Sequence, residues 1–174
     1  MKPPLPITCT ILATSRPDLL ERTIETSTPL ISQCRVVGLN NGADPEITPI
    51  LQPVSDVYLE TDRLGIGEAV SYLTTHLDTE YWLHLEDDWE MVADWHHIEE
   101  AINLLDYAPL VRLRSHADHV DAQKRGIATR KHQVTGKLIR FQPIPPTHLI
   151  GQAHYTLNPS LIRTIDAELA WPAK

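Results

Sequence analysis

The segment YWLHLEDDWEM, residues 81–91, joins an apolar run to three consecutive carboxylates. Residues 81–85 have the composition of a short buried strand. Glu86, Asp87 and Asp88 follow at the carboxyl end of this strand, where ligands bind in open parallel sheets. Adjacent carboxylates repel one another unless a cation or hydrogen-bond donors compensate them, and oxygen ligands suit Mg²⁺ or Mn²⁺. The segment predicts a divalent-metal site; the alternative is an acidic surface turn that caps the following helix.

Strands and helices alternate around this segment through the first 106 residues. Apolar and β-branched runs predict four strands, over residues 6–14, 35–39, 56–60 and 81–85. Apolar residues at helical spacing predict helices from Pro17, limited in length by Pro29, and over residues 65–77 and 95–105, with at most a short helix over residues 46–53. This alternation implies βαβ crossovers, so the expected fold class is α/β, with a mainly parallel, Rossmann-like central sheet flanked by helices.

The pattern changes after Pro109. Strand-like composition returns at three places, residues 110–116, 137–142 and 153–157. A short helix is expected to start after Asn158, because Pro159 suits the first turn of a helix. With 42% apolar residues in 174, the chain is long enough for one core. We therefore expect residues 1–174 to form one domain, in which the last third extends the same sheet.

Composition excludes several classes of protein. With 22% charged residues and 14 prolines, the chain is unlike a disordered or collagenous protein. No run of about 18 apolar residues predicts a transmembrane segment, and the first residues lack the apolar centre of a secretion signal. Cys9 lies in a predicted apolar strand, Cys34 directly precedes another, and the two form no CxxC pair. They suit reduced thiols in a cytoplasmic protein.

Charge is distributed unevenly along the chain. Residues 1–106 contain 19 Asp and Glu against 5 Lys and Arg, whereas residues 112–140 carry a net charge of +6. An acidic chain binds nucleic acid poorly, because that affinity comes largely from Lys and Arg at phosphates, so we expect no nucleic-acid partner. The basic stretch has two open interpretations: a contact to a phosphate-bearing ligand or anionic acceptor, and a solvated surface loop.

Two glycines stand in DRLGIGE, residues 62–68, at a predicted strand-to-helix junction. Glycine lets the backbone approach a ligand, and a helix N-terminus favours anions. Val70 stands where a dinucleotide-binding fingerprint needs its third glycine, and the chain has no GxxxxGK[ST] loop. NAD, FAD and P-loop nucleotide sites are therefore not expected. Phosphate contact and a plain helix start both stay open for these glycines.

The order of four motifs resembles that of the family 2 glycosyltransferases and their relatives with the GT-A fold. The motifs accompany the first four predicted strands and read TILATSRPDLLERTIET, VVGLNNGAD, DRLGIGEAV and LEDDW. GQAHYTLNPSLIR, residues 151–163, is similar to the family's later acceptor-side segment. The resemblance implies a single GT-A domain, with residues 1–106 as its nucleotide-sugar-binding half and residues 107–174 as its acceptor-side half.

This resemblance implies metal-dependent transfer of a sugar from a nucleotide-sugar donor to an undetermined acceptor, with Mn²⁺ or Mg²⁺ as cofactor. Asp88 would be the direct metal ligand. Glu86 and Asp87 would lie near the ribose, the metal or its waters. His154 would complete the metal shell, with His148 as the second choice.

Donor-binding residues are also implied after the first three strands. Thr14, Ser15 and Arg16 would lie under the nucleotide. Asn41 or Asp44 would lie beside the base, and Arg63 would contact the donor.

The sequence departs from the family pattern in several places. Asn40 stands where relatives commonly have an aspartate that recognises the base, so selectivity for uracil stays open. No QxxRW motif is present, which excludes close kinship with processive polysaccharide synthases. Asp166 and Glu168 are the only acids after Arg163 that could act as the general base. Both fall on the tail of an expected helix, so we expect slow transfer unless a partner or a further C-terminal segment completes the acceptor side.

Two alternative functions remain. A sugar-phosphate nucleotidyltransferase shares the sheet and the carboxylate-bound metal, but it would want a glycine-rich, basic loop where this chain has residues 13–17, ATSRP. A non-catalytic module of the same fold would bind a nucleotide sugar or a protein partner without turnover.

Overall fold

The computed structural model describes residues 6–91, 94–113, 128–131, 138–144, 148–151 and 159–172. The chain divides into two compact units, one of residues 1–113 with 157–174 and the other of residues 114–156. The first unit contains a six-stranded sheet, and the second contains a three-stranded sheet. Among the described helices, none is both long and apolar enough to cross a membrane.

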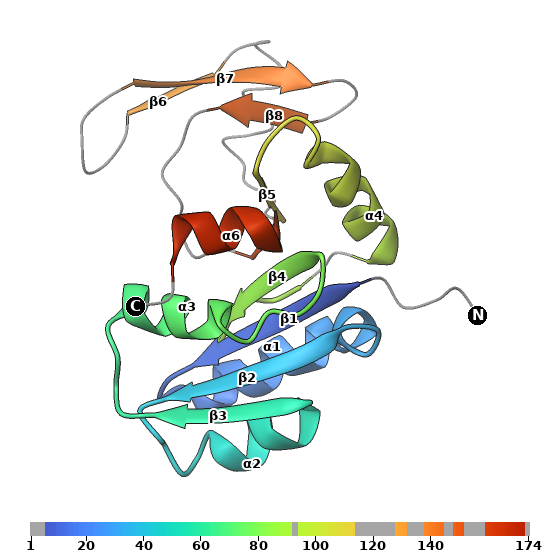
Figure 1. The fold of residues 1–174 in the computed structure, drawn as a ribbon. Helices are drawn as coiled ribbons and strands as arrows, with labels where there is room; N and C mark the ends of the chain where they lie inside the picture. Colours follow the sequence, from blue (N-terminus) through green and yellow to red (C-terminus); the bar gives the residue numbers. More distant parts are fainter. Residues whose placement is uncertain are drawn as a thin grey trace. The chain divides into compact units, whose positions relative to one another are not determined.

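Four adjacent parallel strands make up most of the six-stranded sheet (Figure 1). The strand order is β3 (Val57–Thr61), β2 (Arg35–Asn41), β1 (Ile7–Ala13), β4 (Tyr81–Glu86), β9 (Ser160–Arg163) and β5 (Leu110–Arg112). β1 pairs in parallel with both β2 and β4, and β3 pairs in parallel with β2. β9 lies between β4 and β5 and runs antiparallel to both. The predicted fold class, α/β with a mainly parallel sheet, is confirmed.

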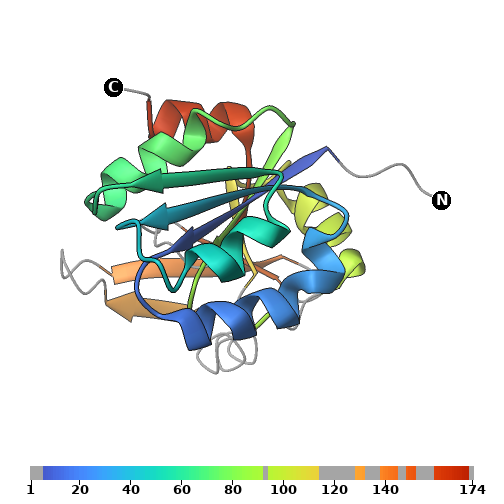
Figure 2. The ribbon, with the colours of Figure 1, turned by 90° about the horizontal axis from the view of Figure 1, so that it is seen from below.

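Helices cover both faces of this sheet (Figure 2). The helices are α1 (Pro17–Ile31), α2 (Thr48–Leu51), the 3-10 turn η1 (Gln52–Val54), α3 (Ile66–Thr74), α4 (Trp95–Leu104) and α6 (Thr164–Ala170). α1, α2 and α4 contribute to one core, whose strand residues include Ile11 and Leu83. α3 closes a smaller core on the other face, against Leu12 and Leu39. All seven residues of β1 are buried, because β1 is central and covered on both faces.

Two expectations for the helices are wrong. Pro29 does not end the first helix, which continues to Ile31; Leu30 and Ile31 are buried in the core, and their burial outweighs the hydrogen bond that proline cannot donate. No helix starts after Asn158 either. Residues 160–163 form β9 between β4 and β5, and helix α6 begins only at Thr164. The strand is favoured because residues 160–162 are buried within the sheet.

The second unit is an antiparallel sheet of three strands in the order β6 (Ala128–Lys131), β7 (Leu138–Ile144) and β8 (His148–Gly151). β7 agrees with the strand expected over residues 137–142. The expectation that the last third extends the main sheet therefore holds for β5 and β9, whereas β6, β7 and β8 form a separate sheet among the strands that the structure describes. The strand expected over residues 153–157 lies outside the described residues, as does His154.

Candidate functional site

The strand order places a topological switch point between β1 and β4. The chain leaves β1 to form β2 and β3 on one side, then crosses to form β4 on the other side of β1. All four strands are parallel, so their carboxyl ends share one edge of the sheet. Ligands of open α/β sheets bind outside this edge, at the switch point. Thr14 and Arg16 follow β1 here, and the three carboxylates lie at the end of β4.

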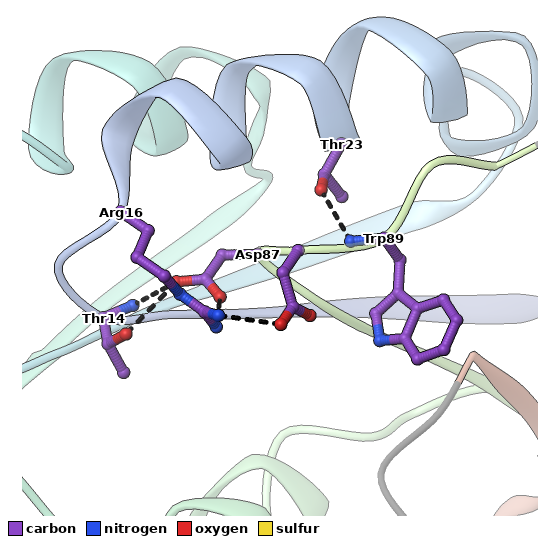
Figure 3. Close-up of polar contacts among 6 residues, drawn as sticks. Thr14, Arg16, Thr23, Asp87 and Trp89 are labelled. Atoms are coloured by element: carbon purple, nitrogen blue, oxygen red, sulfur yellow. Dashed lines mark hydrogen bonds and ion pairs between the residues drawn. The ribbon is translucent and has the colours of Figure 1, made fainter.

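Asp87 joins the two loops at the switch point (Figure 3). Its carboxylate accepts hydrogen bonds from the backbone N–H of Thr14 at 2.9 Å and from the Thr14 hydroxyl at 3.2 Å, both at Oδ2. Oδ1 pairs with the guanidinium of Arg16. The Asp87 side chain is only 2% exposed, and a buried carboxylate needs such donors to stay charged. Asp87 therefore fixes the loop after β1 against the end of β4.

Asp88 shares the same arginine but lies in a different environment. Nη1 of Arg16 donates to Oδ2 of Asp88 at 2.7 Å, and the Asp88 side chain is 37% exposed. Oδ1 of Asp88 has no hydrogen bond within the part of the chain that the structure describes. Arg16 thus bridges a buried carboxylate and an exposed one. The positive charge that offsets the repulsion between these neighbouring carboxylates is supplied here by Arg16.

Glu86 is the last residue of β4 and is half-buried. Burial is the main cause that raises the pKa of Glu86 to about 7; the nearby Trp89 side chain opposes the rise, while the charges of Asp88 and Asp87 add to it. Glu86 therefore holds a proton part of the time at neutral pH, which is the property that a group needs to accept or donate protons there.

His84 lies two residues before Glu86, on the same face of β4, and is fully buried. Its Nδ1 lies 2.8 Å from the hydroxyl of Thr10, which also accepts a hydrogen bond from the indole N–H of Trp82 at 2.7 Å. Burial lowers the pKa of His84 to about 3, so the ring is neutral. Nε2 has no hydrogen-bond partner among the described residues.

Helix α1 holds the acidic segment through contacts that sequence reasoning missed. The backbone N–H of Trp89 donates to the Thr23 hydroxyl at 3.1 Å (Figure 3), and that of Met91 donates to the Thr26 hydroxyl at 3.0 Å. Thr23 and Thr26 are three residues apart and therefore lie on one side of the helix. Threonine is a poor helix former, and its repetition at this spacing is the signal that could have indicated a contact surface.

Asn40 and Asn41 stabilise the loops that follow β2 and β3. Asn40 is fully buried; its amide donates to the backbone oxygen of Asp44 at 2.8 Å, and its Oδ1 accepts from the Asp44 N–H at 3.0 Å. Asn41 exchanges two hydrogen bonds with the backbone of Leu64, at 2.7 and 3.1 Å. Both side-chain amides are engaged by the protein itself. Asp44 is half-buried, and its carboxylate accepts from the N–H of Glu46 at 2.9 Å.

Arg63 lies at the same edge and is exposed. If Gly42 carried a Cβ, that atom would lie 4.0 Å from the Cβ of Arg63. The φ of Gly42 is +132°, a backbone conformation that strains any residue other than glycine. At the N-terminus of α3, the carboxylate of Glu68 accepts a hydrogen bond from the N–H of Gly65 at 3.2 Å. Glu68 thus already supplies the negative charge that this helix end favours.

Some predicted site residues do not join this group. Asp166 and Glu168 lie on α6, which follows β9 at the opposite end of β4: Thr164 bonds to the backbone oxygens of Thr79 and Glu80 at 2.6 and 2.9 Å. That is the amino-terminal edge of the sheet, away from Asp88. By contrast, Thr14, Ser15, Arg16, Asn41, Asp44, Arg63, Glu86, Asp87 and Asp88 all lie at or just after the carboxyl ends of β1 to β4.

No group of three His, Cys, Asp or Glu side chains that could hold a metal ion is found within the described ranges. Mg²⁺ commonly uses only one or two carboxylates together with waters and substrate phosphates. Asp88 fits that role, because it is exposed and one of its oxygens makes no hydrogen bond to a described residue. Asp87 does not fit it as well, since both of its oxygens already accept hydrogen bonds from the protein.

No family model matches this sequence, and no curated protein matches it. Solved structures share its fold. The mannosyltransferase PcManGT from Pyrobaculum calidifontis, in complex with GDP-Man and Mn²⁺, is 14% identical with a TM-score of 0.55, and the match covers 68% of this chain and 37% of that chain. A CMP:2-keto-3-deoxy-manno-octonic acid synthetase complexed with CTP is 12% identical with a TM-score of 0.55, covering 94% of this chain and 76% of that chain. This likeness shows the fold.

Proposed function

We propose that this protein is a transferase that binds a nucleotide sugar at the carboxyl edge of β1 to β4 and moves the sugar to an acceptor. The observation that carries the proposal is the junction of the loop after β1 with the acidic segment after β4, made by Asp87, Thr14 and Arg16 at the switch point. The fold is shared with a mannosyltransferase solved with GDP-Man and Mn²⁺, which supports the same assignment.

Asp88 would hold a divalent metal, with Glu86 nearby. A bound Mn²⁺ or Mg²⁺ supplies positive charge to the diphosphate that leaves the sugar. Thr14, Ser15 and Arg16 would bind the nucleotide and its phosphates. Arg63 is exposed at the same edge and would orient the donor. The proposal is supported by the positions of these residues, which all lie at or just after the carboxyl ends of β1, β3 and β4.

A second candidate is a nucleotidyltransferase that joins a nucleotide to a sugar phosphate or sugar acid. One observation favours it: the match to the synthetase complexed with CTP covers 94% of this chain and 76% of that chain, against 37% of the mannosyltransferase. The loop after β1 argues against it, because ATSRP lacks the glycines that would cradle a triphosphate.

Product analysis separates the candidates. We would incubate the protein with Mn²⁺ and either nucleotide sugars or nucleoside triphosphates plus sugar phosphates, and identify the released phosphate compound. Glycosyl transfer or donor hydrolysis releases a nucleoside phosphate from the sugar nucleotide, and this is the expected result. Release of pyrophosphate from a triphosphate would instead establish the nucleotidyltransferase. Nucleotide-sugar binding without either product would favour the non-catalytic module.

A further inference from the structure

The two carboxylates that share Arg16 hold it unequally. Asp87 is buried, and its charge cannot be left without the guanidinium at low cost. Asp88 is 37% exposed, so water can solvate its charge when a partner leaves. The contact between Arg16 and Asp87 is therefore the anchored one. The 2.7 Å bond between Arg16 and Asp88 is the exchangeable one.

This inequality matters for a metal at Asp88. A divalent cation on that carboxylate would meet the positive charge of Arg16 a few ångströms away, and like charges at that distance repel. The cation must therefore displace the Arg16 bond and tolerate the nearby guanidinium. A bound diphosphate offsets both the lost Arg16 bond and the repulsion between Arg16 and the cation. Its negative charges can pair with the released N–H groups of Arg16 and, at the same time, with the cation.

We propose that Arg16 is the resident counter-ion of Asp88 and that it makes metal binding depend on the nucleotide diphosphate. The inference rests on the proposed function, which supplies the metal and the diphosphate. Without nucleotide, Arg16 occupies Asp88 and divalent metal binds weakly. With nucleotide, the Arg16 guanidinium turns to the phosphates while keeping Asp87, and Asp88 becomes available to the metal. Arg16 is thus a positioning residue that couples the two ligands.

A neighbouring ion pair provides a matched control. Arg22 on α1 pairs with Glu90 at 2.8 Å, joining α1 to the segment after β4. Both side chains of that pair are mostly exposed, 61% and 54%, and neither belongs to the proposed site. Arg22→Gln removes one positive charge from the same region without freeing Asp88.

The test measures Mn²⁺ binding directly, from the electron paramagnetic resonance signal of free Mn²⁺, for the wild type, Arg16→Gln, Arg22→Gln and the double variant Arg16→Gln/Asp88→Asn. Without nucleotide, Arg16→Gln should bind Mn²⁺ at least about tenfold more tightly than the wild type, which is the order expected from removing a charge at this range. Arg22→Gln should match the wild type. The double variant should lose the gain.

Addition of GDP or UDP as the probe should tighten Mn²⁺ binding strongly in the wild type and much less in Arg16→Gln. Arg16→Lys keeps a charge for Asp87 but cannot bridge two carboxylates, so it should fold and show a smaller gain than Arg16→Gln. If Arg16→Gln and Arg16→Lys both bind Mn²⁺ no better than the wild type, the counter-ion role is refuted. Should nucleotides fail to bind any variant while Arg16→Gln still gains Mn²⁺ affinity, the proposed function fails and the role of Arg16 at Asp88 stands.

Discussion

Among the single residues, Glu86 is the one from which we expect the clearest pH dependence of folding stability. Burial raises its pKa from an ordinary 4.5 to about 7, so between those values the folded protein keeps a proton that the unfolded chain releases. Stability from this group is therefore full below about pH 4.5 and falls as the pH rises to about 7. Glu86→Gln imitates the protonated form and removes this loss.

Urea unfolding of the wild type and Glu86→Gln at several pH values measures the effect. The difference in free energy of unfolding should increasingly favour the variant from pH 4.5 to 7 and then level off. His84, with its pKa lowered to about 3, costs stability as the pH falls below 6.5, but it is present in both proteins and cancels. A difference that does not change with pH would contradict the raised pKa.

Thr23 is expected to stabilise the acidic segment through one hydrogen bond. Thr23→Val keeps the shape of the buried side chain but leaves the N–H of Trp89 without its partner, which costs about 1–3 kcal/mol in the free energy of unfolding. Thr28→Val is the control, since the exposed Thr28 hydroxyl bonds only to Ile24 of its own helix. Equal effects of the two substitutions in urea unfolding would show that the contact to Trp89 contributes nothing specific.

The position of the candidate site residues at strand ends was predictable from the sequence, whereas the side chains that they contact were not. A run such as Glu86-Asp87-Asp88 after an apolar stretch indicates a strand-end cluster without any knowledge of contacts. The partner of that cluster is Arg16, about 70 residues earlier, and only the pairing of β1 with β4 brings the two together. Asn41 was expected beside the base because of the family resemblance, and Asn40 was noted as a departure from that resemblance. Their bonds to Asp44 and Leu64 become visible only in the folded loops.

At the scale of elements, two glycines are expected to respond in opposite directions to alanine. A Cβ on Gly38 would lie 2.3 Å from the hydroxyl of Ser55 and 2.8 Å from Cγ of Leu51, so Gly38→Ala forces β2 away from the helical segment behind it. Overpacking of this kind costs about 1–3 kcal/mol. A Cβ on Gly67, in the first turn of α3, would have nothing within 4 Å, and Gly67→Ala should stabilise by about 0.5 kcal/mol.

Thermal or urea unfolding of both variants checks this pair. A Gly38→Ala protein as stable as the wild type would mean that β2 and the segment after it are not packed as tightly as the distances indicate. A loss of stability in Gly67→Ala would indicate that this position needs glycine for some other reason.

Elements differ in how well local sequence predicts them. β1, β2 and β4 were predictable because each is a mostly buried run rich in apolar residues. β3 is only half-buried, but its β-branched and aromatic residues and its place between two helical segments indicated a strand. β9 was not, because Pro159 resembles a helix start and only the position between β4 and β5 makes residues 160–163 extended. The end of α1 was also predicted wrongly, because Pro29 indicates the end of a helix. The buried residues after Pro29 keep α1 helical.

At the scale of the whole molecule, the proposed site depends on how the strand order brings two loops together. The order of β1 to β4 creates a switch point, and the loops that meet there carry the Arg16, Asp87 and Asp88 cluster. In our proposal Asp87 supports the fold of this site, while Asp88, whose bond to Arg16 is exposed, serves the ligand. If that division is correct, Asp88 can be changed with little loss of stability, because an exposed ion pair contributes at most about 1 kcal/mol.

The most direct measurement of this claim is the Mn²⁺-dependent stabilisation by nucleotides and nucleotide sugars, for the wild type, Asp88→Asn and Glu90→Gln. A ligand at 100 times its Kd should stabilise the wild type by about 2.7 kcal/mol, observed as a rise in Tm. Glu90→Gln, which changes an exposed carboxylate two residues away, should keep the Mn²⁺-dependent rise, and Asp88→Asn should lose it with its unliganded Tm nearly unchanged. A full Mn²⁺-dependent rise in folded Asp88→Asn, or no rise with any nucleotide in the wild type, would contradict the proposed site.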